Sequence, residues 1–198
     1  MQALSRSTKR DVLATTPLFA DLRREELEAL AGLVGERRVA RDAIVVRRGE
    51  ADCTLLILVH GRLRAGTVSA EGREVTIGLM EPGAVLGEIA LLDGRPRSLD
   101  VVAMADCLLL SIARRDFLPF LRARPELMLR LMALLCDRLR RASTAFEDVA
   151  LASLSARLAR LLLTLAEAHG VATPDGVQIR RRCRSVTWPP RSARRGSG

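Results

Sequence analysis

The sequence predicts an α+β protein in which a β-roll, or jelly roll, of short strands is flanked by helices. Between Val39 and Leu110, short runs rich in Val, Ile and Leu recur about every 8 to 12 residues and alternate with glycine-containing turns, a spacing typical of such a roll. On either side of this region, apolar residues recur at spacings near three and four, which indicates amphipathic helices. The predicted strands are Ala43–Val46, Thr54–Val59, Arg62–Val68, Glu74–Leu79, Leu99–Val102 and Cys107–Ile112.

An amphipathic helix is predicted to precede the roll. Acidic residues lie early in this segment and arginines late, which suits the helix dipole, and Asp21 is the expected N-terminal cap. We expect this helix to serve packing and not to carry a site. Its apolar positions are Leu22, Leu27, Leu30, Ala31 and Val34.

A second helical region follows the roll. It is expected to begin at Arg114 and to restart near Pro125, because proline is tolerated in the first turn of a helix. From Leu127 an apolar stripe of about three heptads predicts pairing with the same helix of a second copy. The alternative is that this helix simply lies on its own β-roll. The predicted dimer interface comprises Leu127, Leu131, Leu135, Leu139, Ala142, Phe146 and Val149.

Several classes of protein are excluded by composition and motifs. No apolar run approaches the about 20 residues of a membrane span, and the N-terminus lacks the apolar core of a signal peptide, so we expect a cytoplasmic protein without a membrane partner. The four cysteines do not cluster, and His60 and His169 lie far apart, so no metal site is expected. No nucleophile motif or catalytic acid pair is present, which predicts a binding protein and not an enzyme.

The positive charge is concentrated at the C-terminal end. The net charge is +9, yet seven arginines and no acidic residue lie from Ile179 onward, leaving the preceding chain with 25 basic and 23 acidic residues. The arginine-rich, Pro- and Gly-containing tail has no helical apolar period and is expected to be disordered. It is expected to attract phosphate only non-specifically.

The segment from Pro82 to Ala103 has the character of a ligand site. Gly87 permits a close approach of backbone to ligand, and a short helix after it directs N–H groups toward an anion. Arg97 and the Ser98 hydroxyl are donors suited to phosphate, and Glu88 is an acceptor suited to a sugar hydroxyl. Together these groups suit one molecule that carries both a phosphate and a ribose.

This segment resembles the phosphate-binding cassette of cyclic nucleotide-binding domains, which reads G-E-[LI]-[AG]-L and, after a short variable run, R-[SAT]. The resemblance implies that Gly87, Glu88, Ile89 and Ala90 form the opening turn, with Glu88 on the ribose 2′-hydroxyl. It implies that Arg97 and Ser98 hold the exocyclic phosphate oxygens. The alternative is that Glu88 and Arg97 form an internal ion pair in a roll that binds no nucleotide.

The chain from about Pro17 to Ile179 is similar to Crp/Fnr-type transcriptional regulators. In that family the long helix is the dimer seam and closes over the base of the ligand, which implies Ser143 at the purine. Ala142 stands where the family pattern has a second hydroxyl, and Thr144 is the candidate to replace it, so selectivity for adenine stays open. The implied ligand is a cyclic nucleotide, either cyclic AMP or cyclic GMP.

The resemblance to the DNA-binding half of the family is incomplete. Ser153 is a candidate cap for a helix ending at Gly170, and the pattern R-L-A-R within it resembles the first helix of the winged helix-turn-helix domain. The segment from Thr173 to Ile179 resembles the turn and strand of the wing. The two further helices of a DNA reader do not follow, so we expect the DNA-binding output to be lost.

A shift of reading frame is our hypothesis for this break. Reading Arg182 to Ser197 one frame later, with GC-rich degenerate bases, permits L-S-Q-R-D-L-A-A-T-L-G-A-S-R-E-R, which resembles the turn and recognition helix of the family. A single lysine against 31 arginines indicates a GC-rich coding sequence. Resequencing the region that encodes Ile179 to Arg182 tests the hypothesis.

The expected organisation is therefore a nucleotide-binding β-roll with its N-terminal helix at residues 1–122, a dimerisation helix at 123–151, a winged-helix remnant at 152–179 and a basic tail at 180–198. The expected protein is a homodimeric regulator that senses a cyclic nucleotide or a similar effector. The alternatives are a stand-alone effector-binding or dimerisation protein and a ligand-free β-roll scaffold.

Overall fold

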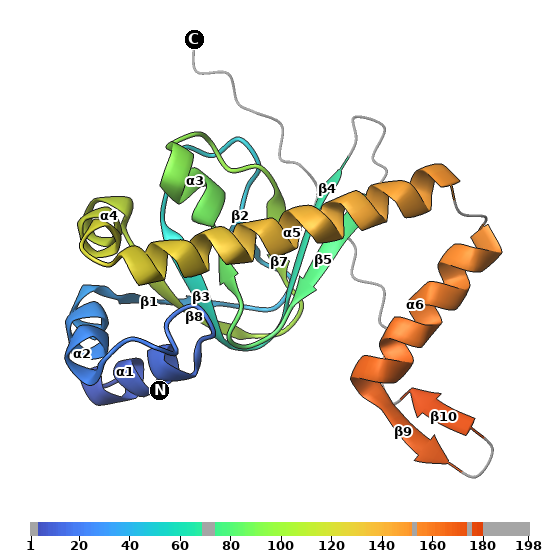
Figure 1. Ribbon diagram of the computed structural model, residues 1–198, viewed down its shortest axis with the longest axis horizontal. Coiled ribbons are helices and arrows are strands. Elements are labelled where there is room, and N and C mark those ends of the chain that lie inside the picture. Colours follow the sequence, from blue (N-terminus) through green and yellow to red (C-terminus); the bar gives the residue numbers. More distant parts are fainter. Residues whose placement is uncertain (1–3, 69–73, 152–153, 174–175, 180–198) are drawn as a thin grey trace. The chain divides into compact units, whose positions relative to one another are not determined.

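The computed structural model describes residues 4–68, 74–151, 154–173 and 176–179 (Figure 1). The described chain divides into two compact units, one up to Arg130 and one from Leu131 onward. This division lies inside the long helix α5 (Pro125–Leu151). The domain limits expected from the sequence, at 122/123 and 151/152, stay predictions. The arginine-rich tail and the frame-shift hypothesis concern residues outside the described part of the chain.

The first unit contains a β-roll of two antiparallel four-stranded sheets, as predicted. One sheet has the strand order β1-β8-β3-β6 and the other β2-β7-β4-β5. All six predicted strands are present, and the prediction for β8 matches its observed limits. The strands are β1 (Gly35–Val39), β2 (Ile44–Val46), β3 (Leu55–His60), β4 (Leu63–Val68), β5 (Glu74–Met80), β6 (Val85–Leu86), β7 (Asp100–Ala103) and β8 (Cys107–Ile112).

Two strands were not predicted, and both lack the apolar pattern of a strand. In β1, with the sequence GERRV, only Val39 is buried, so the alternation of apolar and polar residues cannot be detected. The strand β6 is only two residues long, although it pairs with β3 and leads directly into the predicted cassette. Pairing with neighbouring strands therefore defines both of them.

The inter-sheet core consists of small and medium apolar side chains from both sheets. Successive side chains of a strand point to opposite faces, so one set of alternating residues fills this space. Burying each Val or Leu contributes about 1.5–3 kcal/mol relative to leaving it exposed. The core residues are Val39, Val45, Val46, Leu56, Leu58, Leu63, Ala65, Leu86, Val101, Ala103, Cys107 and Leu109.

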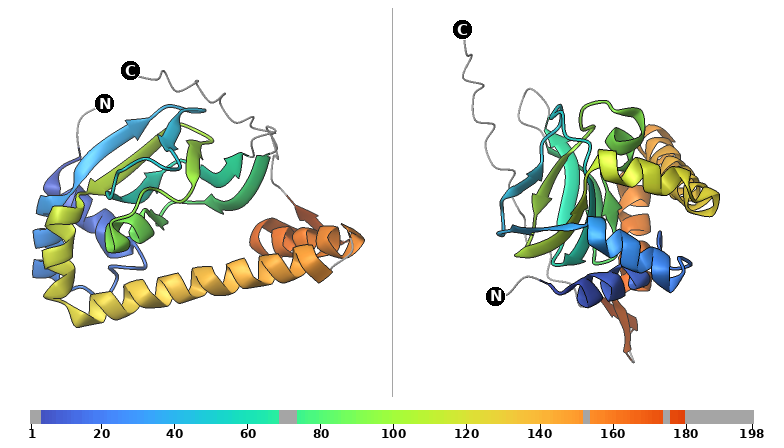
Figure 2. Two further views of the ribbon diagram at one scale, coloured as in Figure 1. Left: turned by 90° about the horizontal axis from the view of Figure 1, so that it is seen from above. Right: turned by 90° about the vertical axis from the view of Figure 1, so that its left-hand side faces the viewer.

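Three helices of the first unit gather beside the roll (Figure 2): α1 (Arg6–Thr15), α2 (Arg24–Leu33) and α4 (Arg114–Arg122). Phe19 and Phe117 are fully buried and meet edge to face, with ring centroids 6.2 Å apart. Phe117 also stacks on Phe120, at 6.3 Å. These aromatic contacts join the segment before α2 to α4.

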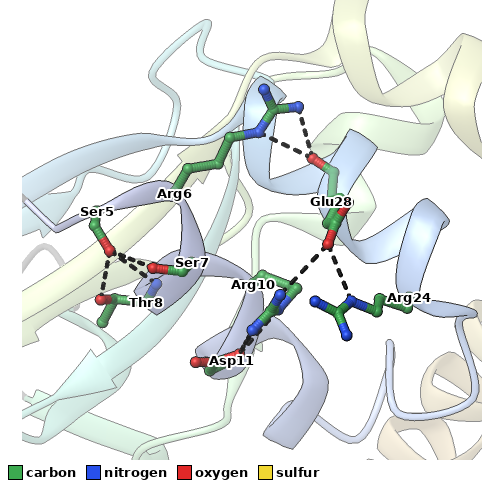
Figure 3. Close-up of polar contacts among 8 residues, drawn as sticks. All are labelled: Ser5, Arg6, Ser7, Thr8, Arg10, Asp11, Arg24 and Glu28. Carbon is green, nitrogen blue, oxygen red and sulfur yellow. Dashed lines mark hydrogen bonds and ion pairs between the residues drawn. The ribbon is translucent and has the colours of Figure 1, made fainter.

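Polar contacts join α1 to α2 (Figure 3). Arg6 donates to the backbone carbonyl of Glu28 over 2.9 Å, while Arg10 and Arg24 pair with the Glu28 carboxylate at 3.4 and 3.2 Å. Because these ion pairs lie in solvent, screening by water leaves them with little effect on stability. They orient the helices more than they stabilise the fold.

The prediction for the N-terminal helix was partly wrong. Leu27, Leu30 and Ala31 are buried on α2 as expected, but the helix begins at Arg24, so Asp21 is not its cap. Instead, the backbone N–H of Arg23 donates to the Glu26 carboxylate over 3.0 Å. The helix α1 was not predicted because, apart from Leu13, its side chains are not fully buried and its apolar face is narrow.

The helices that follow the roll agree with the prediction. The helix α4 begins at Arg114 and α5 at Pro125. In the second unit, α6 (Leu154–His169) ends where Gly170 was expected to stop it, and β9 (Gly170–Thr173) pairs with β10 (Gly176–Ile179) as a hairpin. The expected cap Ser153 lies outside the described residues. None of the described helices combines the length and apolarity needed to cross a membrane.

Candidate functional site

The predicted cassette folds as a tight turn followed by the short helix α3 (Glu88–Asp93). Gly87 precedes the helix with φ +89°, a left-handed conformation that side chains other than that of glycine disfavour. A Cβ at this position would meet the guanidinium of Arg97 and would lie 2.6 Å from the carbonyl oxygen of Thr54. The close approach of Arg97 therefore requires glycine here.

Arg97 is the central charged residue of this site and is only 4% exposed. Its Nη2 donates to the Asp52 carboxylate over 2.7 Å and to the Thr54 carbonyl over 2.6 Å. Its backbone N–H donates to the Glu50 carbonyl, and its own carbonyl accepts from the Gly49 N–H. Side chain and backbone are thus both held in place.

Two nitrogens of the same guanidinium remain without a hydrogen bond. Arg97 Nε and Nη1 are buried and have no partner among the described residues. Leaving a buried polar group unsatisfied costs about 1–3 kcal/mol, and more when the group is charged. A buried cation with free donors is therefore prepared to hold an anion.

Asp52 is the counter-charge of Arg97. Burial by itself raises the pKa of the Asp52 carboxyl, but hydrogen bonds from Thr54 and Arg97, together with the charge of Arg97, outweigh the burial and lower the pKa below its ordinary value. The carboxylate is therefore ionised at neutral pH. Arg97 forms an ion pair with Asp52, and the predicted alternative, a pair between Glu88 and Arg97, stays a prediction.

Glu88 occupies the first turn of α3 and is only 1% exposed. The Arg97 guanidinium lies against Gly87, the residue before Glu88, and the ligand roles of Gly87, Glu88 and Arg97 stay predictions. Of the remaining cassette residues, Ala90 is buried, whereas Ile89 and Ser98 are exposed. Glu88 and Arg97 are thus a buried carboxylate and a buried guanidinium in the cassette.

The far end of α3 is held by a second arginine. Gly94 closes the helix at φ +71°, and its N–H donates to the Ala90 carbonyl over 3.0 Å. Arg114, the first residue of α4, donates from Nε to the Leu91 carbonyl over 2.7 Å. Its Nη2 lies 3.5 Å from the Leu92 carbonyl. The site is thus connected to the helix that precedes α5.

The sequence did not point to Asp52, Thr54 or Arg114 as members of this site. An acidic residue in the turn before a predicted strand was the only available signal for Asp52. Thr54 contributes mainly a backbone carbonyl, which any residue would supply. Arg114 looks like any other helical arginine until α4 is placed beside α3.

The predicted purine contacts Ser143 and Thr144 are exposed residues of α5 in the second unit. Their role toward a ligand stays a prediction from the family resemblance. The predicted dimer residues differ from one another in exposure. Leu127 and Leu131 are buried in the single chain, whereas Leu139 and Phe146 are 68% and 74% exposed.

A cavity elsewhere in the described chain is less suited to an anion. A cavity of about 250 Å³ is lined only by apolar and hydroxyl-bearing residues, so no charged side chain faces it. Within the residues that the structure describes, no cluster of three or more His, Cys, Asp or Glu could hold a metal ion. The lining of the cavity comprises Val12, Thr15, Thr16, Leu58, Val59, Pro82 and Gly83.

The roll and its cassette define a class of protein: residues 36–124 match the family model of the cyclic nucleotide-binding domain. The chain is 31% identical over 150 residues to the cyclic AMP receptor protein of Thermus thermophilus, covering 76% of this chain and 69% of that protein. The chain therefore belongs to the Crp/Fnr family of effector-sensing transcriptional regulators, as the cassette residues predicted.

Further comparisons agree with this assignment. A CRP-like cAMP-activated global transcriptional regulator of Mycobacterium tuberculosis is 26% identical over 170 residues, covering 86% of this chain and 75% of that protein. The crystal structure of the Thermus thermophilus catabolite activator protein superimposes with a TM-score of 0.62 at 27% identity, covering 83% of this chain and 93% of that chain. These relatives are named as regulators or activators.

Proposed function

We propose that this chain binds a cyclic nucleotide, or a closely related sugar phosphate, at Glu88, Arg97 and Ser98, and that the bound ligand controls a dimeric regulator. The observation that carries this proposal is the buried Arg97 with two unsatisfied nitrogens, Nε and Nη1, beside Gly87. A phosphate oxygen would satisfy these donors with charge-assisted hydrogen bonds.

The contacts of Asp52 and Thr54 with Arg97 support the proposal that Arg97 binds the phosphate. Because Asp52 and Thr54 occupy only Nη2, the donors Nε and Nη1 keep their hydrogen-bonding capacity for a ligand. The same two contacts hold the planar group in one orientation, which reduces the entropy that binding would otherwise cost. Glu88, buried next to Gly87, is in the right part of the site to accept a hydrogen bond from a ribose hydroxyl.

The choice between cyclic AMP and cyclic GMP belongs to this proposal and is not determined by the cassette. The Thermus thermophilus and Mycobacterium tuberculosis relatives are named for cyclic AMP. We therefore propose cyclic AMP as the first ligand to test, with cyclic GMP beside it.

Binding is tested by isothermal titration calorimetry with cyclic AMP and cyclic GMP on the wild-type chain and on Arg97→Ala. Losing two charge-assisted hydrogen bonds weakens binding by about a hundredfold or more. Arg95→Ala is the matched control, because it removes the same charge from an exposed side chain two residues away. Equal binding by wild type and Arg97→Ala would contradict the proposal.

One observation favours a second candidate, a ligand-free β-roll scaffold. Asp52 already supplies an anion to Arg97, so the cation is not without compensation in the unliganded chain. Under this alternative the wild-type chain shows no heat of binding with either nucleotide. Thermal melting curves with and without nucleotide would then also coincide.

We also propose that α5 pairs with α5 of a second copy. Leu129, Met132, Leu139 and Phe146 are exposed on the described helix and recur at intervals of three and seven residues. This spacing is that of a coiled-coil seam. Leu127 and Leu131 are buried within the chain, so they are not available to a second copy. The proposed seam therefore begins with Leu129 and Met132, which lie on a different face of α5 from Leu127.

The later residues of the predicted seam, apart from Val149, are also accessible on α5. Leu139, Ala142 and Phe146 are exposed and Leu135 is partly exposed, so all four are accessible to a second copy. The side chain of Val149 lies outside the described part of the structure. Sedimentation velocity or light scattering measures whether the chain is a dimer.

DNA binding is the remaining part of the proposal. The α6 helix and the β9–β10 hairpin are proposed as the beginning of a DNA-binding domain of the kind expected in this family. A gel shift on a palindromic operator, with and without cyclic AMP, tests this output. Ligand-dependent, sequence-specific retardation supports it, and its absence supports an effector-binding protein that acts without direct DNA contact.

A further inference from the structure

The cassette helix α3 is held by one arginine at each end. At its start, the Arg97 guanidinium lies against Gly87, and at its end Arg114 donates to the Leu91 carbonyl. Arg97 belongs to the proposed ligand site, whereas Arg114 is the first residue of α4. The six residues of α3 therefore lie between the proposed ligand site and the next helix along the chain.

Contacts at the two ends of α4 make it a rigid link toward α5. Phe117 is fully buried and meets Phe19 edge to face, which fixes α4 against the segment before α2. Arg124, directly after α4, lies 3.7 Å above the Phe120 ring and pairs with Glu26 of α2 at 2.9 Å. Arg114, α4 and the residue before α5 therefore belong to one continuous set of contacts.

We propose that Arg114 is a positioning residue that transmits the state of the cassette to α4 and α5. The inference rests on the function proposed above. An isolated helix of six residues is too short to be stable, and its last carbonyls have no partner within the helix. Arg114 supplies that missing partner at Leu91, with a second, longer approach to Leu92.

The physical basis of this coupling is that α3 moves as one short body. When a phosphate binds the Arg97 guanidinium and displaces the Gly87 turn, the same displacement shifts the Leu91 carbonyl at the other end of the helix. A charged donor bonded to that carbonyl follows it, because breaking the bond leaves a partly buried guanidinium unsatisfied. Without Arg114, the cassette reorganises upon binding but α4 does not follow.

The experiment compares the wild-type chain with Arg114→Ala, Arg114→Lys and Arg115→Ala. Arg115 is the matched control, because it is the neighbouring arginine on α4, it is exposed, and its ion pair is with the adjacent Asp116. Cyclic AMP affinity is measured by calorimetry, and hydrogen exchange of the α3 and α4 amides is followed with and without nucleotide. Circular dichroism establishes that each variant is folded.

In the wild type and in Arg115→Ala, cyclic AMP is expected to slow exchange in both α3 and α4. In Arg114→Ala, affinity is expected to fall about fivefold to tenfold, with protection near Gly87 retained and the α4 response lost. Arg114→Lys is expected to restore part of the α4 response, because a lysine can still donate to the Leu91 carbonyl. A role confined to stability would lower exchange protection with and without ligand and leave the ligand response of α4 intact.

The experiment distinguishes a failure of nucleotide binding from a failure of the role proposed for Arg114. If the wild-type chain binds neither nucleotide, the proposed function fails and this inference fails with it. If the wild type binds and Arg114→Ala retains the full α4 response, only the role of Arg114 is refuted. If Arg114→Ala does not fold, the decision rests on Arg114→Lys, whose α4 response must then be weaker than that of the wild type.

Discussion

Substitution of Gly87 by alanine is the sharpest test of the site geometry. Gly87 has φ +89°, and an added Cβ would meet the Arg97 guanidinium and lie 2.6 Å from the Thr54 carbonyl. The backbone conformation alone costs alanine about 1–2 kcal/mol. The contact with the Thr54 carbonyl cannot be relieved by rotating a side chain, so the turn or Arg97 must move.

Gly49 provides the matched control for this substitution. It has a similar φ of +82°, but an added Cβ has no atom within 4 Å. Gly49→Ala therefore carries the conformational cost alone, about 1–2 kcal/mol, and, because alanine keeps the N–H that bonds the Arg97 carbonyl, it is expected to weaken cyclic AMP binding less than Gly87→Ala does. Gly87→Ala carries this cost together with the steric one, for a total of about 2–4 kcal/mol.

The assays are urea unfolding followed by circular dichroism and calorimetric titration with cyclic AMP. Because the displaced guanidinium is the proposed phosphate donor, Gly87→Ala is expected to weaken binding by at least about tenfold. Equal stability and equal affinity in Gly87→Ala and Gly49→Ala would refute the reasoning, since the tight packing of Arg97 over the turn would then have no consequence.

Three further outcomes are expected. Folding lowers the pKa of the Asp52 carboxyl, so its contribution to stability is present above the unfolded pKa of about 3.9 and is lost as the pH falls through the lower folded pKa. Asp52→Asn should remove this pH dependence from acid unfolding curves, and unchanged curves would contradict the prediction. Leu139→Glu should convert a dimer to a monomer in light scattering, whereas Arg141→Glu, at an exposed position away from the seam residues of α5, should not. Phe117→Ala should lower the free energy of unfolding by about 3–5 kcal/mol in urea titrations, because the ring is fully buried between Phe19 and Phe120; a loss under 1 kcal/mol would be inconsistent with that packing.

The β-roll could be predicted because most of its strands carry local signals. Apolar runs separated by glycine turns located six of the eight strands of the roll, and the prediction for Cys107–Ile112 matched β8. The failures occurred where the local signal is weak. A strand with one buried residue, Gly35–Val39, and a strand of two residues, Val85–Leu86, are defined by their pairing partners.

The candidate site was predicted in part for the same reason. Gly87, Glu88 and Arg97 lie within one short segment and form a recognisable motif, and the structure places Arg97 against Gly87. The partners of Arg97 were not predictable, since Asp52 lies 45 residues earlier in the chain. Only the folding of β3 beside the cassette places that carboxylate within hydrogen-bonding distance.

The sequence by itself determined the roll, the long helix and the cassette motif, because periodicity and motif spacing are local properties of the chain. Only the tertiary structure decided that Arg97 pairs with Asp52, that Arg114 reaches Leu91 across 23 residues, and that Leu127 is buried while Leu129 is exposed. The physical reason is that a helical stripe or a charged side chain is compatible with several partners, and the packing of distant elements selects one of them.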